Sequence, residues 1–472
     1  MLFNSIEFLL FLPSVFILYW FVFNKNLKDQ NLLILVSSYV FYGWWDYRFL
    51  SLIFLSTVVD YIIGLNIPKQ DSEKKQKLLL WCSVLFNLSM LGVFKYFNFF
   101  INSWIDLFNY LGYEINSIWA LNVILPIGIS FYTFQTMSYT IDIYRKKLEP
   151  TKDFISFASF VSFFPQLVAG PIERASNLLP QILKKREFQY EQGIQGFRLI
   201  IWGMFKKVVL ADSLAPIVDD TFSNYQDFGG GTLWLGAIYF GLQIYCDFSG
   251  YSDIAIGTSK LFGFELMSNF KFPYFSRNIG EFWRRWHISL STWFRDYLYI
   301  PLGGSKKGKL KSIRNIFVIF LVSGFWHGAN WTFIVWGVFH SILFLPSFLF
   351  NTNRNYTYSI IGESSFFPTP KELLQVGATF LLVTIGWVFF RSESIDNSFK
   401  FLNQMFSDFT FKSEFEWLNI YMLSFLIIEY LIRKNERLKV KYFNYDWIVF
   451  SILIIFILDK FGAISNFIYF QF

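Results

Sequence analysis

The side chains best suited to acid–base chemistry in this chain are two of its three histidines, His287 and His327. His287 follows the run Phe-Trp-Arg-Arg-Trp at 282–286, and His327 stands between a tryptophan and a glycine in an apolar segment. Ionisable side chains in apolar surroundings are costly and usually functional. An imidazole has an unperturbed pKa of about 6.5, and burial favours the neutral form that a general base needs. We therefore predict that both histidines belong to one reaction centre.

The two histidines have different predicted roles. His327 would take the proton from a hydroxyl that attacks an acyl carbonyl, a contribution of roughly 10²- to 10⁴-fold in rate. Gly324 and Gly328 bracket it and would permit close approach of a substrate or a neighbouring helix. His287 would orient the acceptor, polarise the carbonyl or share the proton transfer. The alternative for each is a structural histidine: His327 bonded to a backbone carbonyl, His287 held in a network of nearby charged residues.

The third histidine, His340, is not expected at this centre. In a helix continuous from His327, thirteen residues give about 3.6 turns and a rise of about 20 Å, which places His340 far away and nearly on the opposite face. Other chemistries lack their motifs. No H-E-x-x-H or Cys/His cluster predicts a metal centre, and no G-x-S-x-G elbow predicts a serine nucleophile. Thr292 stands where an H-x-x-x-x-D box would need aspartate.

Neighbouring residues are candidates for binding the substrates. Arg284 and Arg285 lie inside an aromatic block and are predicted to meet a phosphate-bearing donor from the cytoplasm. The lysines at 306, 307 and 309 are better explained as ordinary positively charged loop residues on the cytoplasmic side. The other candidates for substrate or donor binding are Trp286, Trp326, Asp296 and Asp247.

Composition indicates what must position these residues. Hydrophobic residues make up 54% of the 472 residues and charged residues only 16%, against about a quarter in soluble proteins. The chain is therefore predicted to be an all-α polytopic membrane protein, one integral domain over 1–472, with roughly ten to twelve transmembrane helices. The predicted spans lie near 6–23, 30–45, 48–66, 78–98, 119–141, 194–213, 231–248, 314–328, 331–350, 371–391, 416–432 and 446–470.

The charge pattern agrees with a membrane location. The net charge of +7 comes from 41 basic and 34 acidic residues, and the basic excess lies in short loops, as expected where loops face the cytoplasm. A nucleic-acid partner is therefore not expected. Lys25 and Lys28 follow the run 6–23, which predicts a retained first span rather than a cleavable signal peptide. Cys82 and Cys246 lie in apolar segments and are expected to be buried free thiols.

Two stretches are predicted to be broken or re-entrant. The apolar run 154–170 contains Pro165 and Gly170 and lies between two basic loops assigned to the same side. The stretch 250–304 mixes many charged residues with aromatic ones. Irregular backbone at membrane depth is tolerated only where it is buried in protein or lines a cavity. We therefore expect broken, partly buried helices inside a ring of ordinary spans.

The motifs at 281–304 and 326–328 resemble the signature of the membrane-bound O-acyltransferase (MBOAT) superfamily. They look most like its bacterial branch of alginate O-acetylase, peptidoglycan O-acetyltransferase and teichoic-acid D-alanyl transferase. Supporting segments at 125–134, 163–172 and 245–253 are similar to the same branch. The resemblance is strongest over 1–390, and 391–472 matches only as additional hydrophobic spans.

The resemblance implies a ring of helices around a thin centre, with His327 as the family's catalytic histidine and His287 as its second. It implies acyl transfer, most simply of acetyl from cytoplasmic acetyl-CoA, to hydroxyls of a cell-surface polysaccharide. No bound cofactor is implied. The expected partners are the bilayer, the polysaccharide and a periplasmic or membrane-anchored acetyltransferase or esterase-like protein, and the expected location is the bacterial cytoplasmic membrane. Two alternatives stay open: D-alanyl transfer to teichoic acid, and a non-enzymatic transporter of polysaccharide or lipid.

Overall fold

The computed structural model describes residues 1–113, 124–168, 170–363, 365–411, 416–438 and 446–462. The secondary structure of these residues is helical, with no β-strand among them. Four helices are long and apolar enough to cross a membrane, at Tyr47–Asn66, Glu73–Tyr110, Trp331–Leu349 and Pro370–Arg391, and shorter apolar helices occur at Ile6–Val22, Phe154–Leu167 and Asn419–Ile432. The all-α membrane class is thus confirmed.

A helix lies in each of the twelve predicted spans. Parts of the spans near 119–141 and 446–470 lie outside the described residues. The number of membrane crossings, the ring around a thin centre and the single domain over 1–472 stay predictions.

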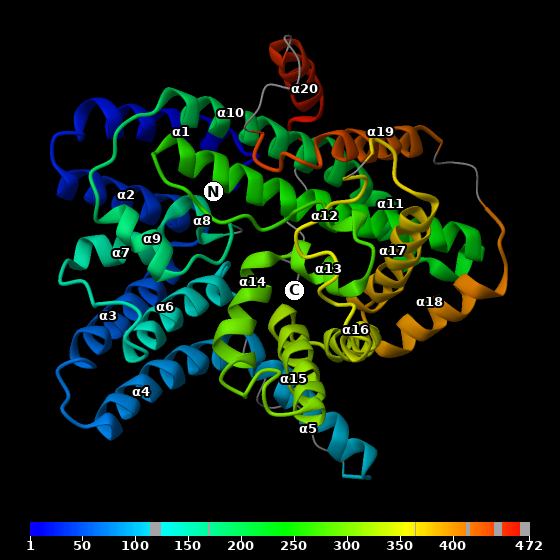
Figure 1. Ribbon diagram of the computed structural model, residues 1–472, viewed down its shortest axis with the longest axis horizontal. Helices are drawn as coiled ribbons and strands as arrows, with labels where there is room; N and C mark the ends of the chain where they lie inside the picture. The colour runs from blue at the N-terminus through cyan, green and yellow to red at the C-terminus, as the bar shows by residue number, and fades with distance from the viewer. Residues whose placement is uncertain (114–123, 169, 364, 412–415, 439–445, 463–472) are drawn as a thin grey trace. The chain divides into compact units, whose positions relative to one another are not determined.

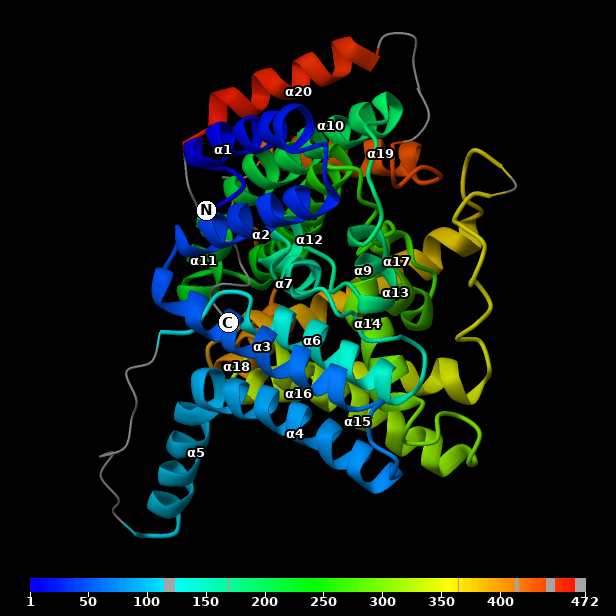
Figure 2. The same cartoon turned by 90° about the vertical axis from the view of Figure 1, so that its left-hand side faces the viewer.

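The described residues form two compact units, the first of which comprises 1–193 and 258–266. Within it α3, α4 and α6 pack against one another (Figure 2). Asp60 of α3 is fully buried there, and it accepts hydrogen bonds from Ser83 at 2.5 Å and Asn87 at 2.8 Å. The helices of this unit are α1 (Ile6–Ile17), α2 (Leu27–Gly43), α3 (Leu50–Asn66), α4 (Glu73–Leu91), α5 (Phe97–Tyr110), α6 (Ile129–Tyr144), α7 (Phe154–Ser162), α8 (Phe164–Leu167) and α9 (Ala175–Ile182).

The predicted break in 154–170 is present in this unit. α7 ends at Ser162 and α8 begins at Phe164, with Phe163 at ψ 103° between them. Proline follows immediately, in the first turn of α8, where its missing N–H and fixed φ are tolerated. The run is therefore two short helices and not one span.

The second unit comprises 194–257 and 267–472 and carries the candidate site. In it α16 packs against α13, α15 and α17 (Figure 1). Its helices are α10 (Tyr190–Met204), α11 (Asp212–Ser223), α12 (Gly230–Leu261), α13 (Ile279–Arg285), α14 (Ile288–Phe294), α15 (Lys309–His327), α16 (Trp331–Leu349), α17 (Pro370–Arg391), α18 (Ile395–Ser407), α19 (Glu416–Ile432) and α20 (Asp446–Lys460). A π-helical segment, Phe205–Ala211, joins α10 to α11.

The predicted break in 250–304 begins later than expected. α12 continues without interruption to Leu261, and the irregular backbone starts beyond it. The helix can continue because its acidic residues are paired inside the protein: Asp247 lies 2.9 Å from Lys207, and Asp253 lies 2.6 Å from Lys206. Further along, α13 and α14 are two separate short helices, as predicted (Figure 1).

Glycines bring α15 and α16 into backbone contact. A Cβ atom added at Gly324 would lie 2.2 Å from the carbonyl oxygen of Phe333, and one added at Gly337 would lie 2.4 Å from that of Phe320. Both distances are far inside van der Waals contact, so only glycine fits. The predicted close approach at Gly324 is confirmed, and its partner is the neighbouring helix.

Candidate active site

His327 is the last residue of α15, and the chain turns directly after it. Gly328 is extended, and Asn330 caps the next helix by accepting a hydrogen bond from the backbone N–H of Thr332 at 3.0 Å. This asparagine side chain satisfies an N–H that would otherwise lack a partner at the start of α16. His327 is therefore at a helix end, only 3% exposed.

His287 lies in the break between α13 and α14. Its backbone has φ +43° and ψ +54°, a left-handed conformation that is uncommon for a residue with a side chain. Asn269 holds this break in place: its backbone carbonyl accepts from the N–H of Ile288 at 2.9 Å, and its Oδ1 lies 2.9 Å from His287 Nδ1. The same Oδ1 accepts from the hydroxyl of Ser289 at 2.9 Å.

The Asn269 contacts assign the tautomer of His287. The backbone N–H of Ser289, which can only donate, points to Asn269 Oδ1 at 3.4 Å, so the amide oxygen faces the imidazole, and Nδ2 at the other end donates to the hydroxyl oxygen of Ser252 at 3.1 Å. An oxygen acceptor at Nδ1 requires the proton on Nδ1. In the neutral ring, the lone pair is then on Nε2.

The structure brings the two predicted catalytic histidines together. Their ring centroids are 6.4 Å apart, with 55° between the ring planes. Trp326 lies beside both, 5.9 Å from the His287 ring and 5.1 Å from the His327 ring. His287 lies between α13 and α14, and His327 lies at the end of α15. The distance between their rings therefore could not be calculated from the number of residues between them.

Aromatic rings fix the orientation of both imidazoles. The ring of Phe248 on α12 meets His287 edge to face at 4.7 Å. Trp336 and Phe390 contact the His327 ring at 5.2 Å and 5.3 Å, also edge to face. Among the described residues no group of three His, Cys, Asp or Glu gathers as metal ligands do.

The expectation that His340 lies far from the site was wrong. It rested on a helix continuous from His327, but α15 ends at that residue and α16 folds back beside α15. His340 therefore contacts the same indole as His327: its ring lies 4.9 Å from that of Trp336, against 5.2 Å for His327. Both imidazoles thus contact the ring of Trp336.

The predicted donor-binding arginines also anchor the segment after α16. Arg285 pairs with Glu281 at 2.8 Å and donates to the carbonyl of Ser359 at 3.0 Å. Arg284 donates to the carbonyl of Asn353 and has no ion pair among the described residues. Arg285 thus forms a close ion pair with a carboxylate, whereas Arg284 forms none among the described residues, and its Nη2 has no hydrogen-bond partner there.

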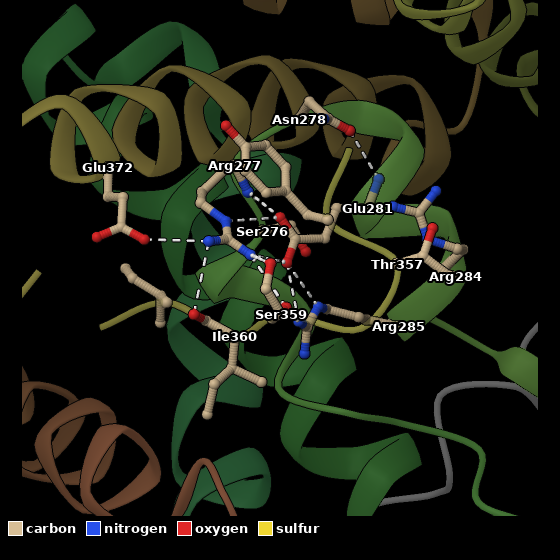
Figure 3. Close-up of polar contacts among 12 residues, drawn as sticks. Ser276, Arg277, Asn278, Glu281, Arg284, Arg285, Thr357, Ser359, Ile360 and Glu372 are labelled. Atoms are coloured by element: carbon tan, nitrogen blue, oxygen red, sulfur yellow. Dashed lines mark hydrogen bonds and ion pairs between the residues drawn. The ribbon is translucent and has the colours of Figure 1, made fainter. Parts of the chain in front are cut away.

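Arg277 is the centre of this anchor (Figure 3). Its guanidinium lies between two carboxylates, 3.1 Å from Glu281 and 3.0 Å from Glu372, and donates to Ser359 at 3.0 Å. The ring of Tyr356 stacks on it at 3.8 Å. A buried guanidinium with all these partners holds the 351–360 segment against α13, the helix that ends at Arg285 just before the break that contains His287.

The remaining candidates differ in how close they are to the histidines. Trp286 is buried and stacks on Phe282, directly before His287. Asp247 is buried in an ion pair with Lys207. Asp296 pairs with its neighbour Arg295 at 2.7 Å, where the side chains are partly exposed. Substrate or donor binding by these residues, by Trp326 and by the two arginines stays a prediction.

Sequence reasoning missed Asn269 and the two lysines that pair with α12. Lys206 and Lys207 are buried in the π-helical segment within the predicted span 194–213. Lys207 bridges Asp212 at 2.7 Å and Asp247 at 2.9 Å. Two adjacent lysines in an apolar run were a visible signal, because charges at membrane depth need partners. Asn269, in contrast, stands in a polar loop that gives no such signal.

Comparisons with known proteins show what this chain is similar to. The sequence profile of MBOAT, the membrane-bound O-acyltransferase family, matches residues 40–357. The probable alginate O-acetylase AlgI of Pseudomonas syringae pv. tomato is 42% identical over 411 residues, 86% of this chain and 75% of that protein. The peptidoglycan O-acetyltransferase of Helicobacter pylori is 35% identical over 439 residues, covering 86% and 80%. The teichoic acid D-alanyltransferase of Streptococcus thermophilus is 33% identical over 232 residues, covering 46% and 55%.

Proposed function

Because this chain belongs to the membrane-bound O-acyltransferase family and is therefore an O-acyltransferase, we propose that it moves an acetyl group from cytoplasmic acetyl-CoA to hydroxyls of a cell-surface polysaccharide. The observation that carries this proposal is the pairing of His287 and His327 in one buried aromatic site, with ring centroids 6.4 Å apart. Family membership also sets aside the transporter alternative.

In the proposed step His327 is the base. A hydroxyl oxygen of the acceptor attacks the carbonyl carbon of the thioester while His327 takes the hydroxyl proton. The tetrahedral intermediate then collapses, the carbon–sulfur bond breaks, and the thiolate takes the proton back from His327, which releases coenzyme A as the free thiol. His287, with its Nε2 lone pair set by Asn269, orients the hydroxyl or shares the proton.

Acetyl is the proposed acyl group because the relatives named for acetyl transfer match a larger share of this chain than the relatives named for D-alanyl transfer. The relatives named as O-acetylase and O-acetyltransferase match over 86% of this chain. Two relatives named as D-alanyltransferases match over 46% and 58% of it. D-alanyl transfer to teichoic acid is the second candidate. We place the protein in the bacterial cytoplasmic membrane. The direct route, in which the attacking hydroxyl belongs to the polysaccharide itself, is the one tested below; in the other route a periplasmic or membrane-anchored partner receives the acetyl group and passes it to the polymer.

Arg284 is the proposed contact for the phosphates of the donor. Its charge has no carboxylate partner among the described residues, whereas Arg285 is paired with Glu281. A charged hydrogen bond contributes about 1.5–3 kcal/mol, so Arg284→Ala should raise the KM for acetyl-CoA by about tenfold or more. Arg285→Ala should instead lower stability, because it leaves a buried carboxylate with one cation fewer. Equal KM for wild type and Arg284→Ala would remove Arg284 from the donor site.

The central test is His327→Ala. Cells that express this variant at the wild-type level in the membrane should lose the alkali-labile acetyl groups that wild-type protein adds to surface polysaccharide. Cys82 was expected to be buried, but it lies on the exposed face of α4, so Cys82→Ser is the control and should retain them. Undiminished acetylation by His327→Ala would refute the proposal. Surface label from D-alanine in place of label from acetate would favour the second candidate.

A further inference from the structure

His340 lies where α16 meets three other helices, and it has no exposed surface. The ring of Trp283 on α13 meets it edge to face at 5.0 Å, and the ring of Phe320 on α15 stacks on it at 6.4 Å. On the third side is Gly386 of α17, where an added Cβ atom would lie 2.7 Å from His340 Nε2. The imidazole therefore touches the helix that leads into the His287 break and the helix that ends at His327.

Trp336 connects His340 to the site. Its indole is fully buried, with the His327 ring on one edge at 5.2 Å and 85°, and the His340 ring at 4.9 Å and 66°. Protein interiors are close-packed and transmit displacement from one side chain to the next. A change in the position of the His340 ring must therefore move the indole against which His327 is oriented.

Ring packing, and not hydrogen bonding, fixes His340. Neither of its ring nitrogens has a hydrogen-bond partner among the described residues, and the same is true of the indole nitrogens of Trp283 and Trp336. Leaving a buried polar group without a partner costs about 1–3 kcal/mol. Four such nitrogens lie in one group of contacting rings. Leucine or phenylalanine would fill the same space without this energetic cost, so packing alone does not explain a histidine at this position.

We propose that His340 is a positioning residue for acyl transfer at His327, acting through Trp336, and that glycine is required at 386 to leave room for its ring. The inference rests on the proposed function, with His327 as the base. A misplacement of about 1 Å at a reacting group can lower a rate by about 100-fold. His340 does not touch the reacting atoms, so its effect belongs to the rate of the chemical step and not to substrate affinity.

The test is a double-mutant cycle at 340 and 386. The rate of thiol release from acetyl-CoA is measured in membrane vesicles that contain the full chain, with surface polysaccharide from cells lacking the protein as the acceptor. Gly386→Ala pushes on the imidazole, and His340→Ala removes the support of Trp336. Each should lower kcat by about 10- to 100-fold with the KM for acetyl-CoA unchanged. Gly377→Ala on the same helix, where an added Cβ meets nothing within 4 Å, should behave as wild type.

The combined variant separates positioning from general damage. In His340→Ala with Gly386→Ala the new methyl group points into the vacated space, so the second substitution should add almost no further loss. The proposal is overturned if the single variants keep the wild-type kcat, if their losses multiply in the combined variant, or if kcat per folded protein is unchanged and only the amount of folded protein falls. Failure of wild type and Gly377→Ala to release thiol would instead refute acetyl transfer itself, and the positioning role with it.

Discussion

Replacing Asn269 with leucine should slow acyl transfer although Asn269 lies outside every motif that predicted the site. Leucine is close to asparagine in size and shape but offers no oxygen. The substitution removes the acceptor for His287 Nδ1 at 2.9 Å and for the Ser289 hydroxyl at 2.9 Å, and it also removes the donor to Ser252 at 3.1 Å. It keeps the backbone bond from Ile288 to the carbonyl of residue 269. The break between α13 and α14 therefore stays, while the imidazole loses the partner that sets its tautomer.

The expected loss in the rate of transfer follows from the two hydrogen bonds to His287 and Ser289. A buried hydrogen bond contributes about 0.5–1.5 kcal/mol, so two of them give about 1–3 kcal/mol. The backbone of His287 is left-handed, with φ +43°, which costs about 1–2 kcal/mol. The hydrogen bonds of Asn269 compensate for this cost, so without them the backbone of His287 can move toward a less strained conformation. Free energies of 1–3 kcal/mol correspond to rates lower by about 5- to 150-fold.

The assay is thiol release from acetyl-CoA in vesicles, read as kcat and KM separately. Asn269→Leu should lower kcat, and Asn269→Asp, which keeps an acceptor oxygen toward Nδ1, should recover most of it. His287→Ala sets the lower limit. If Asn269→Leu transfers acetyl at the wild-type rate while His287→Ala does not, the tautomer of His287 has no part in the reaction and the reasoning fails.

Three further predictions concern residues that support the helices around the site. Gly324→Ala places a methyl group 2.2 Å from the Phe333 carbonyl oxygen, so α15 and α16 must separate by about 1.2 Å to reach an ordinary 3.4 Å contact, and transfer should fall by about 100-fold at unchanged donor KM. Lys207→Met leaves two buried aspartates without their cation and should cost about 3–5 kcal/mol, measured as a lower midpoint of thermal unfolding in detergent; an unchanged midpoint would contradict the ion-pair argument. Asp408 lies outside the membrane spans and accepts hydrogen bonds from the backbone N–H of Gly230 at 2.7 Å and from Thr410. These bonds lower the pKa of Asp408. The ionised carboxylate of Asp408 therefore stabilises the folded protein at pH values above its unfolded pKa of about 3.9, and this stabilisation is lost as the pH falls through the lower pKa of the folded state. We expect Asp408→Ala to lower the midpoint of thermal unfolding at neutral pH and to have the wild-type midpoint in strong acid.

The helices were predictable because apolar length is a strong signal, and the motif histidines because rare ionisable residues in apolar sequence are informative. The break in 154–170 was predictable from Pro165 and Gly170 together with the basic loops on both sides of the run, which were assigned to the same side of the membrane. The distance between His287 and His327 was not predictable, since it depends on how α13, α14 and α15 pack and not on the number of residues between the two positions.

The wrong expectation for His340 had a detectable cause in the sequence. Gly328 and Asn330 separate two apolar runs, and an asparagine immediately before an apolar run is a common helix N-cap. The predicted spans 314–328 and 331–350 already separate the two histidines, so a helix continuous from His327 to His340 conflicted with them, and two helices folded back on one another bring His340 toward His327. The continuation of α12 past Gly250 depended instead on Lys206 and Lys207, which lie more than forty residues away and supply charge that no local pattern in α12 reveals.

Both histidines sit where a helix stops, and the chemistry gives a reason. A base inside a continuous helix shares its surroundings with residues three and four positions away on both sides, whose side chains cover it. At the end of α15 the chain after His327 turns away through Gly328, and at the α13–α14 break the left-handed backbone of His287 turns its ring toward Phe248 and Trp326. A helix end has no following turn of its own to cover the imidazole, so each ring is contacted mainly by other elements. The strained backbone of His287 lies at one of these breaks, and the glycines of α15 and α16 set the contact of the helix that ends at His327, so substitutions at either place should lower activity.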